Sequence, residues 1–359
     1  STGGYVLFLL WCFYWWLNQD ELLTVPSPFP SVEIIIPARN EALNIVGVLD
    51  DLRKQQYHGS SFCVAVIDDH STDHTLQHCL DYAKCYPEFP LTCHRLSDQE
   101  SKKNAIAEAV GKSSAEWIVT VDADVQIASV KWLEVLMSNA NESADLICGP
   151  VVLGCEEKKN FFSRVASLES VGLTAIAAAG IKSGHPIFCN GANLAFRRKV
   201  FLEVNGYEGT GHQMTGDDTA IMRKINPAKI RYAQQHEAVI RALPPDDLSG
   251  FMLQRQRWAS KIPASLSRAT LLVSLFAWLT HAGVFLALFG WISPQLAVTF
   301  FLLKGVIEFL LLKVAGRFFE IKVSAVLILA LQSFYAVAIT MIGILSVFLP
   351  YQWKGRKSN

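Results

Sequence analysis

Asp122 and Asp124 follow a run of apolar and β-branched residues at positions 117–121. Such a run predicts a buried parallel strand, and open α/β sheets bind ligands beyond the carboxyl ends of such strands. We interpret residues 119–125 as one strand, in which residues two apart point to the same side. Both carboxylates could then converge on one hard cation that also binds phosphate oxygens. The alternative is a strand end whose acids only cap the next turn.

Two other polar loops are expected at the same edge of the sheet. One follows the strand predicted at residues 32–36 and contains Ala38 and Glu41. The other follows the strand predicted at residues 62–68 and contains Asp69. Because parallel strands end at one edge, we expect these loops to meet near the two aspartates and form one site.

The second loop also carries residues with simpler explanations. Asp73, taken alone, is best explained as a helix N-cap. Three histidines spaced by four residues share a helical face and could chelate a metal, although histidines on a helix surface are more often only solvated: His70, His74 and His78.

The elements that must position these loops alternate between strand and helix. Strands are predicted at residues 32–36, 62–68, 91–94, 117–121 and 145–152. Helices are predicted between and after them at residues 42–55, 73–84, 102–111 and 130–139. This alternation predicts βαβ units and an α/β fold with a mostly parallel sheet.

Further polar groups occur downstream. Asn190 and Gly191 lie between apolar runs, and Asp217 and Asp218 open a helix predicted at residues 219–225. Acidic residues at a helix start are favourable for dipole reasons alone, which is the alternative to a catalytic role.

One later helix face combines an amide, a cation and an indole. Gln254, Arg257 and Trp258 are spaced i, i+3 and i+4, so they share that face. Arginine offers a planar fork for phosphate and tryptophan a flat wall for a sugar. The alternative is an anchor at a membrane interface, where Arg and Trp are common.

Composition excludes some classes of function. The 359 residues contain equal numbers of basic and acidic side chains, so the formal charge is zero and gives no support for nucleic-acid binding. The eight cysteines form no Cys-x-x-Cys pair, and several fall in predicted strands. We therefore expect reduced, buried cysteines in a cytosolic environment and no disulfide framework.

Apolar stretches predict membrane segments at both ends of the chain. Residues 5–17 are too short for the about 20 residues of a comfortable span, so we expect a truncated membrane helix. Residues 271–292 and 323–350 contain no charged side chain and are long enough to cross a bilayer. Between them lies an apolar segment with Lys304 and Glu308, four residues apart, which could pair. That segment either faces a bundle interior or lies in the interface.

Five of these motifs, taken in order, resemble those of the membrane-bound family 2 glycosyltransferases, which include cellulose, chitin and hyaluronan synthases and ceramide glucosyltransferase. The resemblance extends over residues 31–261, and the glycine that often precedes the family's lysine is Ser101 here. Its strength comes from the order of the motifs, which are IIIPARNE at 34–41, VIDDHSTD at 66–73, KKNA at 102–105, TGDD at 215–218 and QRQRW at 254–258.

The resemblance implies a GT-A-like fold and an inverting, metal-dependent transferase that moves a hexose from a UDP-sugar to a membrane lipid, with Mg²⁺ or Mn²⁺. It implies Asp218 as the catalytic base, supported by Asp217, and Asp124 as a metal ligand together with Asp122. The other implied roles are nucleotide-sugar binding by Ala38, Glu41, Asp69, Lys102, Asp122, Gln254, Arg257 and Trp258, and acceptor binding by Asn190, Gly191 and Trp258.

The expected organisation is an integral protein of the inner or cell membrane whose catalytic domain faces the cytoplasm. Its segments are a membrane segment and linker at 1–25, a catalytic domain at 31–245, interfacial helices at 246–268, a membrane region at 270–350 and a basic tail at 351–359. Two other functions remain open: a processive polysaccharide synthase that extends a glycan, and an inactive subunit that only binds nucleotide sugars.

Overall fold

The structure is a computed structural model of the 359-residue chain. It describes residues 2–18, 27–58, 61–97, 99–154, 160–210, 216–260, 268–291, 293–348, 352–353 and 356–357. The chain forms two compact units. We call residues 20–152 and 184–243 the sheet unit, and residues 1–19, 153–183 and 244–359 the helical unit.

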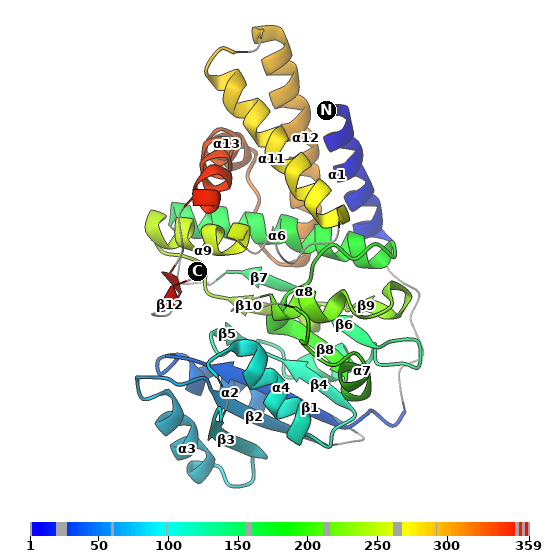
Figure 1. The fold of residues 1–359 in the computed structure, drawn as a ribbon. Coiled ribbons are helices and arrows are strands. Elements are labelled where there is room, and N and C mark those ends of the chain that lie inside the picture. Colours follow the sequence, from blue (N-terminus) through cyan, green and yellow to red (C-terminus); the bar gives the residue numbers. More distant parts are fainter. Residues whose placement is uncertain are drawn as a thin grey trace. The chain divides into compact units, whose positions relative to one another are not determined.

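The sheet unit is built on seven strands in the order β3-β2-β1-β4-β8-β6-β9 (Figure 1). Strand β1 pairs in parallel with β2 and β4, β2 with β3, and β6 with β9, whereas β8 runs antiparallel to both its neighbours. The predicted α/β fold with a mostly parallel sheet is therefore confirmed. The strands are β1 (Val32–Ala38), β2 (Phe62–Asp68), β3 (Leu91–Arg95), β4 (Trp117–Thr120), β6 (Leu146–Cys148), β8 (Leu194–Arg197) and β9 (Ile230–Tyr232).

Four helices connect these strands close to the predicted residues, another begins two residues before its predicted start at 219, and one at residues 198–203 was not predicted. They are α2 (Ile45–Arg53), α3 (Thr75–Cys85), α4 (Lys102–Lys112) and α5 (Trp132–Met137), followed by α7 (Arg198–Glu203) and α8 (Asp217–Met222). Helix α4 begins at an N-cap, because the Ser101 hydroxyl accepts a hydrogen bond from the Lys103 amide at 3.2 Å. Ser101 therefore caps helix α4, at the position where the family described above often has glycine.

The prediction of one strand over residues 119–125 is wrong. Strand β4 ends at Thr120, and Asp122 to Asp124 lie in a turn. The chain leaves the main sheet there because β5 (Val125–Gln126) joins a second sheet of order β5-β10-β7 and pairs antiparallel with β10 (Ile240–Ala242). The alternation of side chains in a strand therefore does not set the directions of the two aspartates.

The strand predicted at residues 145–152 is also divided. Its first half is β6 in the main sheet, and its second half is β7 (Val151–Leu153) in the small sheet. Gly149 and Pro150 separate the halves. Proline has no N–H to donate to a ladder, so it favours the end of one strand and a change of sheet. Short 3₁₀ turns complete the unit at η1 (Gly191–Asn193), η2 (Pro227–Lys229) and η3 (His236–Ala238).

The helical unit consists of long apolar helices and a short hairpin (Figure 1). Two of its described segments, Phe161–Lys182 and Ala325–Ile342, are long and apolar enough to cross a membrane by length and composition. The elements are α1 (Thr2–Leu17), α6 (Phe161–Lys182), α9 (Leu248–Ser260), α11 (Arg268–Leu288), α12 (Pro294–Phe318), α13 (Ala325–Phe348), β11 (Gln352–Trp353) and β12 (Arg356–Lys357).

A charged pair lies inside the helical unit among many apolar side chains, and other apolar side chains of the unit face outward. Lys304 is 1% exposed, and its Nζ lies 2.8 Å from the Glu308 carboxylate, which also accepts a 2.7 Å hydrogen bond from the Tyr5 hydroxyl. By contrast, Leu302 and Val306 on the same helix are more than half exposed. The predicted pairing of Lys304 with Glu308 is confirmed, and the pair faces the interior of this unit.

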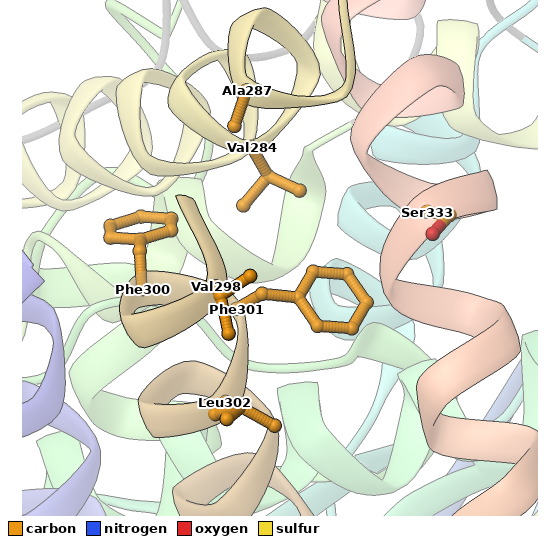
Figure 2. Close-up of a pocket in the computed structure, with 7 residues that line it drawn as sticks. All are labelled: Val284, Ala287, Val298, Phe300, Phe301, Leu302 and Ser333. Carbon is orange, nitrogen blue, oxygen red and sulfur yellow. The ribbon is translucent and has the colours of Figure 1, made fainter. Parts of the chain in front are cut away.

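An apolar pocket of about 270 Å³ opens between α11, α12 and α13 (Figure 2). Its lining residues are Val284, Ala287, Val298, Phe300, Phe301, Leu302 and Ser333. Ser333 supplies a hydroxyl and the other side chains are hydrocarbon, so this pocket does not suit a charged nucleotide.

Candidate active site

The loops after β1 and β2 are tied to each other by hydrogen bonds between backbone and side chains. The Asn40 amide donates to the Ser71 hydroxyl at 3.0 Å, and the Thr72 amide donates to the Asn40 side chain at 2.8 Å. The Glu41 amide donates to the Thr75 hydroxyl at 2.7 Å. The prediction that these two loops meet at one edge of the sheet is confirmed.

The residues predicted to cradle a nucleotide lie at this junction. The Ala38 carbonyl accepts a 2.8 Å hydrogen bond from the Asp69 amide, and the Asp69 carbonyl accepts one of 2.8 Å from Arg39 Nη1. Glu41 is 5% exposed and its carboxylate accepts from the Asn44 amide group at 2.7 Å. These contacts make a braced double loop.

A lysine and two aspartates form the charged centre of the site. Lys102 Nζ lies 2.7 Å from Asp122 Oδ1 and 3.3 Å from Asp217 Oδ2. The Lys102 side chain is 18% exposed and that of Asp217 is 7% exposed. The fold thus joins the start of α4, the turn after β4 and the start of α8, three regions that are far apart in the sequence.

Asp218 is more accessible than its neighbour Asp217, and both of its oxygens are held. Its Oδ1 accepts a 2.6 Å hydrogen bond from the Thr219 amide, and its Oδ2 accepts one of 3.3 Å from the Gly191 amide. Asp217 is buried, whereas Asp218 is partly exposed. A carboxylate that is oriented on one side and open on the other can take a proton from a bound group.

The electrostatics reflect this concentration of acids. Burial by itself lowers the pKa of Lys102, but attraction to Asp122, Asp217 and Asp218 outweighs it and raises that pKa above its usual value. Burial, followed by repulsion from the charges of Asp217 and Asp218, raises the pKa of Tyr207 well above 10. Lys102 therefore stays a cation and Tyr207 a neutral phenol at physiological pH.

The loop that carries Asn190 and Gly191 is held by hydrogen bonds of the buried Asn193 side chain. Asn190 is exposed and its side chain accepts from the Ala192 amide at 3.0 Å, whereas Gly191 is buried. The fully buried Asn193 side chain donates to the carbonyls of Pro150 and Ala238 at 3.0 and 2.8 Å. Its oxygen accepts from the indole of Trp132 at 3.2 Å.

Three predicted residues lie on α9 in the helical unit: Gln254, Arg257 and Trp258. All three are partly exposed. Their predicted roles in holding a diphosphate and an acceptor stay predictions.

The buried residue of that motif is Arg255, which the sequence analysis did not single out. It is 3% exposed, forms an ion pair with Glu169 of α6, and donates to the Gln254 side chain at 2.7 Å. Its guanidinium carbon lies 3.6 Å from the ring centre of Phe251 and 5.3 Å from that of Trp258. Spacing alone gives no signal for it, since it lies between the motif positions.

The cysteines with described positions are free. Cys189, immediately before Asn190, is in hydrogen-bonding contact with Cys148 at the end of β6. Cys85 is exposed, so the expectation that the cysteines are buried is wrong for that position.

A metal at this site would need ligands from its substrate as well as from the protein. Within the described ranges, no three His, Cys, Asp or Glu side chains are grouped to hold an ion, so the histidines at 70, 74 and 78 make no such group. Asp122 and Asp124 lie in one turn and are partly exposed. Mg²⁺ and similar ions are commonly held by one or two carboxylates with substrate phosphates completing the shell, and this pair fits that partial set of ligands.

Comparison with known proteins assigns residues 33–204, which include most of the sheet unit and helix α6 of the helical unit. The family model "Glycosyl transferase family 2" matches residues 33–204, which include the double loop, Lys102, Asp122, Asp124 and Gly191. The chain carries a family 2 glycosyltransferase domain. The expected family is thereby confirmed for this domain.

Curated relatives of the family 2 domain are distant. An N-acetylglucosaminyltransferase from Neorhizobium galegae is 26% identical over 243 residues, covering 65% of this chain and 55% of that protein. A β-monoglucosyldiacylglycerol synthase from a Nostoc species is 29% identical over 112 residues, covering 31% of this chain and 24% of that protein. The chain spans about half the length of the rhizobial relatives that it matches.

One solved structure resembles the chain over nearly its whole length. It is a mannosyltransferase from Pyrobaculum calidifontis in complex with GDP-Man and Mn²⁺, and it is 16% identical with a TM-score of 0.61. The match covers 96% of this chain and 95% of that one. At this identity the likeness shows the fold, which is the GT-A-like fold expected for a family 2 domain.

Proposed function

We propose that the chain is an inverting, metal-dependent glycosyltransferase that moves a hexose from a UDP-sugar to a membrane lipid. The observation that carries the proposal is the arrangement around Asp218. This partly exposed carboxylate is held by two backbone amides and lies next to Asp217, whose charge Lys102 balances. If Asp217 and Asp218 only stabilised the start of α8, they would not need the buried Lys102, which also contacts Asp122.

The proposed chemistry is a direct displacement. Asp218 accepts the proton of the acceptor hydroxyl as its oxygen forms a bond to the anomeric carbon. The bond between that carbon and the nucleotide diphosphate breaks, and the diphosphate leaves with its electron pair. Because no covalent intermediate with the enzyme intervenes, the configuration at the anomeric carbon inverts.

Asp122 and Asp124 would hold the divalent cation, Mg²⁺ or Mn²⁺, which supplies charge neutralisation for the departing diphosphate. The double loop built on Ala38, Glu41 and Asp69 would bind the nucleotide. Lys102 would keep the acidic residues in place before the donor binds, and contact the diphosphate afterwards.

The choice of sugar and acceptor is supported by the relatives of the chain. The rhizobial relatives are N-acetylglucosaminyltransferases, which favours a donor whose sugar is N-acetylated at the 2-amino position, so this form of hexose is the second candidate beside glucose. The Nostoc relative is named for synthesis of a glucosylated diacylglycerol, which supports a lipid acceptor.

Membrane attachment is supported by the outward-facing apolar side chains of the helical unit and by its two segments that are long and apolar enough to cross a membrane. A charged pair and other polar groups lie inside, whereas leucine and valine side chains face outward. That distribution suits hydrocarbon surroundings better than water. We place the protein in the inner or cell membrane, with the family 2 domain in the cytoplasm where nucleotide sugars are made available to it.

The test is release of UDP by the purified protein from UDP-glucose and UDP-N-acetylglucosamine, with Mg²⁺ or Mn²⁺, with and without a lipid extract. We expect release that depends on lipid and gives a discrete glycolipid product. Asp218→Asn should keep UDP affinity but lower turnover by about 10²- to 10⁴-fold, as loss of a general base does. Glu203→Gln, an exposed acid on α7, is the matched control and should turn over normally.

Two outcomes would contradict this proposal. Near-normal turnover by Asp218→Asn would remove Asp218 as the base. Release without lipid, together with a product of high molecular weight, would make the protein a polysaccharide synthase instead.

A further inference from the structure

Thr120 carries a buried hydroxyl that contacts the loop held against the proposed catalytic carboxylate. It is the last residue of β4 and is 1% exposed. Its neighbours across the sheet are Ile35 of β1 and Leu194 of β8. A threonine in an otherwise apolar strand interior must find an acceptor for its hydroxyl proton.

The acceptor is the backbone of the loop before β8. Thr120 Oγ1 donates to the Gly191 carbonyl at 2.7 Å and lies 3.4 Å from the Leu194 carbonyl. The shorter contact falls on the residue whose amide donates to Asp218 Oδ2 at 3.3 Å. One glycine therefore joins the hydroxyl of β4 to the carboxylate at the start of α8.

Glycine is required at this junction because of close approach. A Cβ atom on Gly191 would lie 2.9 Å from Asp217 Oδ2, 3.4 Å from the Cβ of Asp218 and 3.5 Å from Lys102 Nζ. The first of these distances is shorter than real Cβ contacts. The absence of a side chain thus lets the Gly191 backbone reach the carboxylates.

We propose that Thr120 is a positioning residue for Asp218: its hydrogen bond to the Gly191 carbonyl fixes the backbone of Gly191, and the amide of the same residue in turn sets the direction of the Asp218 carboxylate. This deepens the proposed function and rests on it in taking Asp218 as the base. Thr120 itself touches neither the sugar nor the nucleotide.

The same strand end leads directly to the turn with Asp122 and Asp124. Thr120 therefore fixes the position of the base relative to the residues proposed to hold the leaving group. A general base works only when it lies within hydrogen-bond reach of the proton that it takes. A shift of the Gly191 backbone should reduce turnover without changing how the donor binds.

The experiment compares Thr120→Val with Thr120→Ser in the purified full chain. Valine keeps the shape and removes the hydroxyl, leaving the buried Gly191 carbonyl without its donor. We expect Thr120→Val to lower kcat by about 10- to 100-fold, the size of effect of a misplacement near 1 Å, with donor KM within about twofold of wild type. Thr120→Ser should restore kcat to within about threefold, since it keeps the donor.

The matched control is Thr92→Val. Thr92 Oγ1 on β3 also donates to the carbonyl of a neighbouring strand, that of Val64 at 3.4 Å, and Thr92 lies outside the proposed site. Its replacement should leave kcat unchanged. A normal kcat in Thr120→Val, or an equal loss in Thr120→Ser, would overturn the proposal.

Two further measurements keep the test decisive. If Thr120→Val does not fold, Gly191→Ala tests the same junction from the other side and should lower kcat with donor KM retained; an unchanged kcat would overturn the proposal. Crystal structures of wild type and Thr120→Val give a readout that needs no turnover. If the hydrogen bond from the Gly191 amide to Asp218 is lost in Thr120→Val, the positioning role holds, even if the protein consumes no donor and the proposed function fails. If that hydrogen bond is kept in the variant, the positioning role is overturned.

Discussion

Lys102 is the cation near which three acidic side chains of the proposed site lie. Its ammonium group contacts Asp122 and Asp217, and attraction to these acids and to Asp218 raises its pKa despite the cost of burial. Carboxylates brought this close repel one another unless a positive charge lies between them. Lys102 therefore allows the acids of the turn after β4 and of α8 to occupy one site.

Asp124 is, together with Asp122, a residue that we propose holds the divalent cation. We expect Asp124→Asn to weaken UDP binding in the presence of Mg²⁺ or Mn²⁺ by about 10- to 100-fold, the loss typical of an altered metal site. Isothermal titration calorimetry with and without EDTA measures this effect. Equal UDP affinity in wild type and variant, with and without metal, would show that Asp124 holds no ion.

At the scale of elements, side chains rather than backbone join neighbouring helices and strands. Glu108 of α4 accepts hydrogen bonds from the Ser97 amide at 3.0 Å and from Lys112 Nζ at 2.6 Å, and lies 3.1 Å from His94 Nε2 of β3. In the helical unit, the pair of Arg255 and Glu169 joins α9 to α6. These contacts link α4 and α9, which carry proposed site residues, to β3 and α6.

The Glu108 contacts predict a pH dependence of stability. Burial raises the pKa of Glu108, but hydrogen bonds from Lys112 and Ser97 outweigh it and lower that pKa to about 2. A depressed carboxyl pKa contributes stability above the unfolded value near 4.5, and that contribution is lost as the pH falls towards 2. Glu108→Gln should therefore melt below wild type at pH 6, with the difference shrinking between pH 4.5 and 2. A difference in melting temperature that stays constant over this window would contradict the assignment.

Arg255 should matter more for stability than the partly exposed arginine of the same motif. Removing one partner of a buried ion pair typically costs about 3–5 kcal/mol, because the other charge stays buried and unpaired. We expect Arg255→Met to lower the thermal midpoint clearly and Arg257→Met to lower it less. The double variant Arg255→Met with Glu169→Leu should recover most of the loss. If Arg255→Met and Arg257→Met lower the thermal midpoint equally, the ion pair of Arg255 with Glu169 adds no stability.

At the scale of the whole molecule, the two units differ in which side chains face outward. In the sheet unit the apolar side chains fill the space between strands and helices, as in β1, where Ile34, Ile35 and Ile36 are fully buried. In the helical unit Lys304 is buried while leucines and valines face outward. The outward-facing leucines and valines suit the membrane setting that we propose for the helical unit.

Two valines test this difference directly. Val306 of α12 is 58% exposed and Val46 of α2 is 39% exposed. If Val306 faces lipid, Val306→Asp should cost about 2.5–3.5 kcal/mol of insertion and reduce the protein in carbonate-washed membranes, whereas Val46→Asp should not. Immunoblots of the membrane fraction measure both. If Val306→Asp leaves the membrane yield unchanged or makes the protein more soluble, that face is in water.

The sequence by itself determined which local elements form and in what order the chemical groups appear. Periodicity and composition are local properties, so the strands that became β1 and β2, the helix α4 and the acids at the start of α8 could all be predicted. The order of these motifs pointed to the family of the sheet unit. The mostly parallel sheet followed from the alternation of strand and helix.

Tertiary structure alone decided how distant residues meet. Asp122 and Asp124 lie in a turn because β5 pairs with β10, which is more than 100 residues away. The linkage from Thr120 through Gly191 to Asp218, and the burial of Arg255 against Glu169, join segments whose separation leaves no periodic signal. Such contacts depend on how strands and helices pack after they form, and a residue's own neighbours in sequence carry no record of them.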